Sequence, residues 1–113
     1  MNWKQITELY NREYEKDLFP YFYDEVKKVS NQAQDLGLKG HTSHSSLIIY
    51  KEDLEDEIVI FIQPIINGKV AYGYIEDRPI SHPAQDAKNV CEHTELEEKI
   101  KSYLIEVSKQ KNK

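Results

Sequence analysis

Two strand-forming runs separated by Asn67-Gly68 constrain the fold of this chain more than any other feature of its sequence. The first run contains the β-branched and aromatic residues 58–62, and the second extends from Lys69 to Ile75. Asn-Gly between two such runs favours a two-residue turn, because both residues can adopt positive φ angles with little strain. The chain is therefore expected to build an antiparallel sheet around this hairpin.

A two-residue turn also predicts the register of the hairpin, with Ile66 opposite Lys69, so that Phe61 faces a tyrosine. One face of the sheet would then carry Ile58, Ile60, Ile62, Ala71, Gly73 and Ile75. The other face would carry Val59, Phe61, Gln63, Ile65, Val70, Tyr72 and Tyr74. Neither face shows the polar alternation of a solvated sheet. Both faces are therefore expected to be covered, and the small residues of the first face leave room for helices.

Helical patterns precede the hairpin. Apolar residues at helical spacing from Trp3 to Tyr14 predict a first helix of about four turns. A second helix is expected to begin at Pro20, which suits a first helical turn, and to end at Gly37. Its core-facing stripe is predicted as Phe22, Val26, Val29, Ala33 and Leu36. Its solvated face is predicted as Asp24, Glu25, Lys27, Lys28, Asn31, Gln34 and Asp35.

A further helix is expected after the hairpin. It would open at Thr94, because Thr94 and Glu97 have the spacing of a capping box. Its buried stripe is predicted as Leu96, Ile100, Tyr103, Leu104 and Val107.

The remaining segments complete the expected fold. A strand is predicted at about residues 43–51, before the hairpin. In residues 77–93, two prolines favour a loop, and residues 84–91 fit either a short helix or an edge strand. The elements together predict one α+β domain over residues 1–113. It would contain two N-terminal helices, a three- or four-stranded antiparallel meander, and a C-terminal helix packed on one sheet face.

Composition excludes several classes of protein. The chain has 113 residues, a single cysteine and a formal net charge of −5. A lone cysteine cannot form an internal disulfide, which is typical of a reducing compartment. The longest apolar run is far shorter than the roughly 20 residues that span a bilayer, and no signal-peptide pattern follows Met1. No basic stripe indicates nucleic-acid binding. A cytoplasmic protein that binds neither membrane nor nucleic acid directly is expected.

Histidines and the cysteine raise two chemical hypotheses. A zinc site would take its ligands from His41, His44, Cys91 and His93. Structural zinc sites usually contain paired cysteines, however, and two histidines three positions apart on an extended chain point to opposite faces. We therefore predict no metal and no cofactor. A histidine-dependent hydrolase would need His44, beside several serines, to approach His82 or His93. No nucleophile elbow surrounds those serines, so an enzyme is not expected.

An acid-rich segment precedes the hairpin. Its carboxylates are Glu52, Asp53, Glu55, Asp56 and Glu57. The segment lacks the glycine and the alternating aspartates of a calcium-binding loop. It fits either a solvated tip whose charges deter edge-to-edge aggregation or a contact that accelerates association with a basic partner. The second interpretation makes these residues candidate partner-binding residues.

Tyrosines are numerous, with eight in the chain. Tyr72 and Tyr74 are expected on the same side of the hairpin as Phe61, which fits a cross-strand aromatic cluster. Tyrosine is also common in interfaces, where it offers a large apolar area with a polar tip. We therefore predict that Tyr72 and Tyr74 bind a partner through a face that is partly covered.

In size, acidity and order of elements, the chain resembles the immunity proteins that bacteria produce against polymorphic or contact-dependent growth inhibition toxins. The residues behind this resemblance are the acid-rich residues 52–57 and the tyrosine-lined run from Val70 to Tyr74. The resemblance concerns architecture and involves no motif. It implies a tight one-to-one complex with a basic toxin domain, often a nuclease. The alternatives are a secretion chaperone or dimeric adaptor, which would form a homodimer in isolation, and the histidine-dependent hydrolase.

Overall fold

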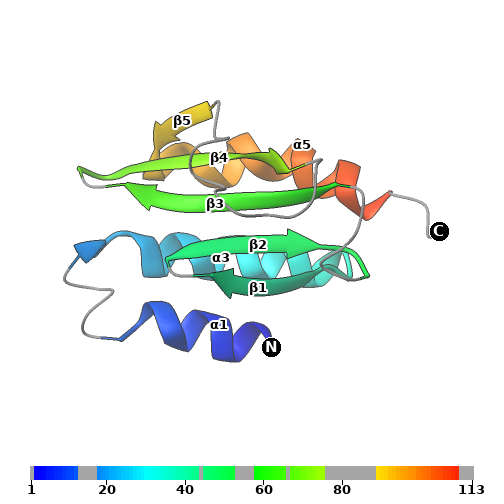
Figure 1. Ribbon diagram of the computed structural model, residues 1–113, viewed down its shortest axis with the longest axis horizontal. Coiled ribbons are helices and arrows are strands. Elements are labelled where there is room, and N and C mark those ends of the chain that lie inside the picture. The colour runs from blue at the N-terminus through cyan, green and yellow to red at the C-terminus, as the bar shows by residue number, and fades with distance from the viewer. Residues whose placement is uncertain are drawn as a thin grey trace.

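Five strands form one antiparallel sheet, in the order of the sequence, within the residues that the computed structural model describes: 2–12, 18–43, 45–52, 58–65, 67–75 and 89–109 (Figure 1). The strands are β1 (Lys39–Ser43), β2 (Ser46–Tyr50), β3 (Val59–Ile65), β4 (Lys69–Ile75) and β5 (Asn89–Glu92). The described helices are α1 (Trp3–Tyr10), α3 (Phe22–Asp35) and α5 (Leu96–Ser108), with the 3-10 turn η1 (His93–Glu95) before α5. The predicted α+β class and order of elements are confirmed.

The helices pack on one face of the sheet and enclose the main hydrophobic core. Figure 1 shows α3 and α5 running behind the strands, while α1 lies beside β1. The core includes the buried residues Ile6, Phe22, Val26, Ile100 and Leu104 from helices and Leu47, Ile49, Ile60, Ile62 and Val70 from strands. Burial of each such side chain contributes roughly 1.5–3 kcal/mol, so this layer is the main source of stability. Within the described ranges, no helix is long and apolar enough to cross a membrane.

α1 is held against β1 by a close approach at Gly40. A Cβ atom at Gly40 would lie 2.7 Å from the Trp3 ring and 2.8 Å from Ile6, so glycine is required there. The Trp3 indole N–H also donates to the main-chain oxygen of Leu38 at 3.0 Å. The helix has eight residues and leaves helical geometry after Tyr10, so it is shorter than the predicted one.

The opposite face of the sheet is also buried. Val59 and Phe61 have no solvent-accessible surface and form a second cluster with Ile48. Both faces of the sheet therefore carry buried side chains.

The hairpin loop contains the predicted backbone geometry, but the predicted register is wrong by one residue. Asn67 and Gly68 adopt φ angles of 77° and 76°, as expected. However, Ile65 rather than Ile66 pairs with Lys69. Such a shift moves side chains to the other face relative to the partner strand.

The shift changes which residues share a face. Phe61 pairs with Gly73 on the side away from the helices, where a Cβ atom on Gly73 would lie 3.3 Å from the Phe61 ring. Tyr72 and Tyr74 pair with isoleucines of β3 and face the helices. The helices therefore cover the face that carries the large residues. The face with Ala71 and Gly73, which was expected to receive the helices, is the opposite one.

Two strands occupy the region where one was expected. β1 and β2 form a hairpin with Ser43 paired to Ser46, in place of a single strand over residues 43–51. The β1 sequence Lys-Gly-His-Thr-Ser has no apolar alternation, which explains why the pattern did not reveal it. β5 agrees with the edge-strand interpretation where the two overlap, at residues 89–91, and residues 76–88 lie outside the described part.

The buried stripe of α5 is confirmed for Leu96, Ile100, Leu104 and Val107. The predicted capping box of Thr94 and Glu97 is wrong, because the chain enters α5 through η1 and no capping side chain bonds to either N-terminus. Instead, the His93 N–H donates to the Gly68 oxygen at 2.8 Å. The hairpin loop therefore anchors the start of this segment.

α3 differs from its predicted pattern at two residues. Phe22, Val26, Val29 and Ala33 are buried as expected. Leu36 lies past the last turn and is 39% exposed. Glu25 was expected on the solvated face, yet it is 3% exposed because it faces His93 at the start of η1.

Candidate functional site

The hairpin loop is attached to the first turn of α3 by Tyr21. The Tyr21 hydroxyl lies within hydrogen-bonding distance of the carbonyl oxygens of Ile65 and Lys69, and it accepts from the Ile65 N–H at 3.1 Å. Ile65 and Lys69 form the last pair of the hairpin, so these bonds stabilise the observed register. Burial raises the pKa of Tyr21, although the backbone hydrogen bond to Ile65 opposes the shift. The Tyr21 ring also packs on His93, with centroids 4.7 Å apart.

A buried carboxylate completes this region. Glu25 Oε1 lies 3.5 Å from His93 Nδ1 and 3.4 Å from Lys28 Nζ. Glu25 Oε2 and His93 Nδ1 have no hydrogen-bond partner among the described residues. The contact between Glu25 and His93 joins α3 to η1. It lowers the folding stability to some extent, because a buried carboxylate is left incompletely hydrogen-bonded. We call Tyr21, Glu25, Gly68 and His93 the hairpin clamp.

Tyr72 and Tyr74 belong to an aromatic cluster between β4 and α5. Tyr74 stacks on Tyr103 with centroids 4.2 Å apart, and Tyr72 lies 5.8 Å from the same ring. The Tyr74 hydroxyl donates to Glu106 at 2.8 Å, and burial together with this carboxylate raises the pKa of Tyr74. Phe61 points to the other face of the sheet. The third aromatic ring of this cluster is therefore Tyr103 of α5 and not Phe61. Tyr72 is 8% exposed, and partner binding by Tyr72 and Tyr74 stays a prediction.

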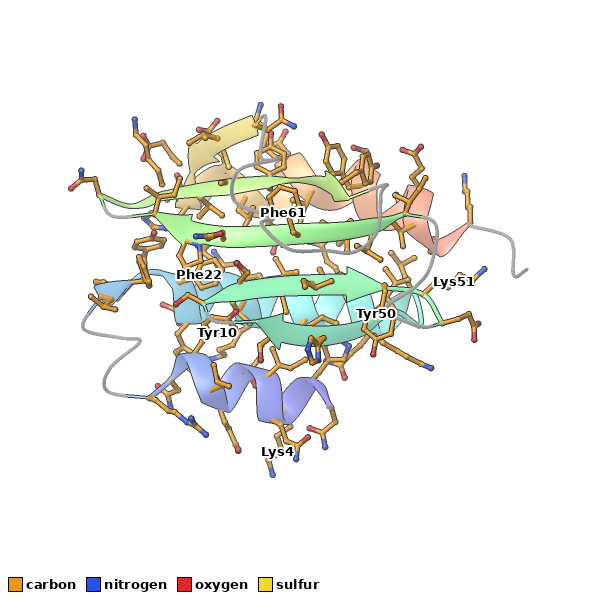
Figure 2. All side chains as sticks on the ribbon, in the orientation of Figure 1. Lys4, Tyr10, Phe22, Tyr50, Lys51 and Phe61 are labelled. Atoms are coloured by element: carbon orange, nitrogen blue, oxygen red, sulfur yellow. The ribbon has the colours of Figure 1, made fainter. Side chains whose placement is uncertain are left out.

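Of the acid-rich segment, Glu52 lies in the described residues. It is exposed after the end of β2, and its main-chain oxygen accepts from Lys39 Nζ at 3.2 Å. Asp53, Glu55, Asp56 and Glu57 lie outside the described residues, so their contact with a partner also stays a prediction. Figure 2 shows Tyr50 and Lys51, just before Glu52, at one end of the sheet.

A groove of about 530 Å³ opens between the C-terminal half of α3 and the exposed side of α5. Its lining residues are Gln32, Asp35, Leu36, Glu97, Glu98, Lys101 and Ile105. Leu36 and Ile105 are 39% and 38% exposed, so they form an apolar floor that is open to solvent. Three carboxylates against one lysine give the lining a net charge of −2. We call this feature the α3/α5 groove.

The Leu36 end of the α3/α5 groove and the start of the acid-rich segment lie at the same end of the molecule. Leu36 is followed after two residues by Lys39, the first residue of β1. Lys39 in turn bonds to the main chain of Glu52. Figure 1 shows the ends of α3, β2 and α5 on this side, opposite the hairpin loop. Of the groove carboxylates, Asp35 therefore lies at the same end as Glu52, whereas Glu97 and Glu98 lie in the first turn of α5, which begins beside the hairpin loop.

The residues considered as candidate zinc ligands are not brought together in the described part of the chain. His41 lies in β1, His93 faces Glu25, and His44 lies outside the described residues. Searching the described ranges finds no group of three histidine, cysteine or carboxylate side chains that could hold a metal ion. Burial, with a smaller contribution from Glu95, raises the pKa of the Cys91 thiol. A thiol held in the protonated form is a poor nucleophile.

Sequence reasoning missed the groove, although one signal for it was present. The helical period of α3 predicts a core position for Leu36, and the capping-box spacing predicts a capping role for Glu97. Ile105, however, is a large apolar residue that falls outside the predicted stripe of α5. Comparison of the chain with protein-family models, curated proteins and solved structures finds no match. Function therefore has to be inferred from the shape and charge of these surfaces.

Proposed function

We propose that this protein is a small cytoplasmic binding protein, without enzymatic activity, that neutralises a basic protein partner. The closest functional type is a bacterial immunity protein that inhibits a toxin domain by forming a tight complex. The observation that supports the proposal is the excess of carboxylates on two surfaces of the fold. The lining of the α3/α5 groove has a net charge of −2, and the acid-rich segment begins at Glu52, after the end of β2.

A nuclease-type toxin is the partner whose chemistry fits best. A nuclease cleft is positively charged because it binds the phosphate backbone. Clustered carboxylates accelerate association with such a surface and occupy the positions of phosphates within it. The net charge of −5 on the whole chain adds to this attraction.

Binding to the domain encoded by the neighbouring reading frame tests the proposal. We expect a one-to-one complex by light scattering and loss of that domain's toxicity on coexpression. Replacing Glu52, Asp53, Glu55 and Asp56 with serine should slow association at low salt and leave the melting temperature unchanged, because clustered like charges repel one another and add little stability. A wild-type chain that neither binds this domain nor suppresses its effect contradicts the proposal.

One observation favours the dimeric adaptor as a second candidate. Val90 in β5, an edge strand of the described sheet, is 56% exposed and offers an apolar contact to another copy of the chain. Sedimentation of the isolated protein discriminates between the two functions. A stable homodimer that Val90→Lys dissociates would favour the adaptor, and a monomer that becomes more stable on binding the toxin domain would favour the immunity protein.

A further inference from the structure

We infer that the α3/α5 groove binds a cationic amphipathic helix of the protein partner. One or two aliphatic or aromatic side chains of that helix would lie on the apolar floor, and its lysine or arginine side chains would face the carboxylates at the rim. The inference rests on the proposed function in one respect, that the partner is a basic protein. It adds a contact surface that includes neither the acid-rich segment nor the tyrosine cluster.

The apolar floor provides the first reason. Five large apolar side chains are exposed in the described part of the chain, and two of them, Leu36 and Ile105, meet at this groove. Leu36 follows the last turn of α3 and Ile105 belongs to α5, so the fold brings together an apolar surface that neither segment presents alone. The groove volume of about 530 Å³ lies within the usual range for binding pockets.

The charges at the rim provide the second reason, because they favour a partner of positive charge. Asp35, Glu97 and Glu98 line the groove and form no ion pair with any described residue. Their carboxylates are therefore available to a cationic partner. An acidic segment would face like charges there, so the rim discriminates against it.

The dimensions of the groove suit a helix. The lining of α5 extends from Glu97 to Ile105, which is roughly 12 Å at the rise of an α-helix and matches about two turns. An amphipathic helix that binds in a groove uses apolar side chains about one turn apart. Two such side chains would reach the floor, while basic side chains flank them at the rim.

Titration with a synthetic amphipathic helix of leucine and lysine tests the groove directly. We expect the NMR signals of the Leu36 and Ile105 methyl groups to shift, with affinity at least about tenfold above that for a scrambled peptide of the same composition. The scrambled peptide controls for net charge, and a leucine–glutamate helix controls for apolar surface. Shifts centred elsewhere, or equal affinity for the scrambled peptide, would overturn the inference.

Variants of the groove sharpen this test. Leu36→Ser combined with Ile105→Ser should weaken peptide binding at least about fivefold. The matched control, Val90→Ser, removes an exposed apolar side chain outside the groove and should leave binding unchanged. Glu97→Gln combined with Glu98→Gln should weaken binding and reduce its salt dependence. Equal losses from the groove and Val90 variants would indicate non-specific adhesion and overturn the inference.

The same variants separate this inference from the proposed function. If wild-type protein inhibits the neighbouring toxin domain and the Leu36→Ser/Ile105→Ser variant inhibits it equally well, the groove inference fails and the proposed function remains. If the wild type inhibits no such domain, the proposed function fails, and the peptide titration still decides whether the groove binds a cationic helix.

Discussion

The two ends of the α3–α5 helix pair make opposite kinds of contact. At the hairpin clamp, Tyr21 and His93 bond to or pack on the hairpin, and Glu25 is 3% exposed. At the α3/α5 groove, Leu36 and Ile105 are 39% and 38% exposed. Asp35, beside Leu36, forms no ion pair with any described residue. One end of the helix pair is joined to the sheet, and the other end presents a surface.

From this difference we expect the hairpin clamp to contribute to folding stability and the α3/α5 groove to contribute to binding. The clamp connects residues that are far apart in sequence, since the bonds of Tyr21 to Ile65 and Lys69 span 44 and 48 positions. Such contacts order the chain and are lost on unfolding. The groove has few contacts to lose, so changes there should affect a partner more than the fold. Substitutions at the two ends test this division.

Gly68→Val should have the largest effect of the changes at the clamp, destabilising the protein by about 1–3 kcal/mol. Gly68 has a φ of +76°, which a β-branched residue resists, and its Cβ would lie 3.3 Å from the His93 ring. Urea unfolding measures the loss. Asn67→Gly is the control, because glycine accepts the φ of 77° at that position without strain. An unchanged unfolding midpoint for Gly68→Val would show that the loop does not require this conformation.

Tyr21→Phe should cost about 1 kcal/mol, because it keeps the ring and removes the hydroxyl that bonds to the hairpin ends. Tyr50→Phe is the matched control, since the Tyr50 hydroxyl has no hydrogen-bond partner among the described residues. Thermal unfolding of the two variants gives the difference. Equal stability of both variants would mean that the Tyr21 hydroxyl does not stabilise the observed register.

Alkaline pH should destabilise the protein by a smaller, gradual effect. The pKa values of Tyr21, Tyr72 and Tyr74 are raised by burial in the folded state, and for Tyr74 also by Glu106. As the pH rises above about 10, the unfolded chain loses phenolic protons that the native protein retains. The contribution of these tyrosines to the free energy of unfolding is therefore fully present below that pH and is lost as the pH rises above it.

Tyr74→Phe should make this alkaline decline shallower, because it removes one of the groups that titrate differently in the two states. Urea unfolding at a series of pH values from neutral to alkaline measures the slope. Tyr50→Phe again serves as the control. A decline of the same steepness in Tyr74→Phe and wild type would mean that Tyr74 does not contribute to it.

Ile105→Ser in the groove should have the smallest effect on stability, within about 1 kcal/mol, because Ile105 already contacts solvent. The adjacent Leu104 has no exposed surface, and Leu104→Ala should cost about 2–5 kcal/mol. Guanidinium unfolding of these neighbouring variants compares the two sides of α5. A large loss for Ile105→Ser would mean that the groove floor belongs to the core.

Local patterns in the sequence predicted much of the fold. The positive φ angles of Asn67 and Gly68 follow from the chemistry of these two residues alone, and the structure confirms them. The buried stripe of α5 follows from its helical period, which needs no knowledge of what covers it. The α+β class follows from the order of such segments.

Contacts between distant segments account for what the patterns missed. In the observed register the ends of the hairpin bond to Tyr21, a distant residue that no local rule for Asn-Gly turns includes. The helical position of Glu25 predicts a solvated side chain. Its burial follows only from the contact with His93, which is distant in sequence. Leu36 satisfies the period of a core stripe but lies beyond the last helical turn. The groove exists because two helices meet, so neither helix sequence could reveal it.

The contact between Trp3 and Gly40 has a spectroscopic consequence. Trp3 is the sole tryptophan of the chain, so its emission reports the environment of a single place, where α1 meets β1. An isolated helix of eight residues is hardly stable in water, so α1 should be helical only while it is docked on β1. If α1 detaches before the sheet melts, tryptophan emission will change ahead of far-ultraviolet circular dichroism. The fluorescence of this one residue would then follow the opening of the N-terminal edge of the fold.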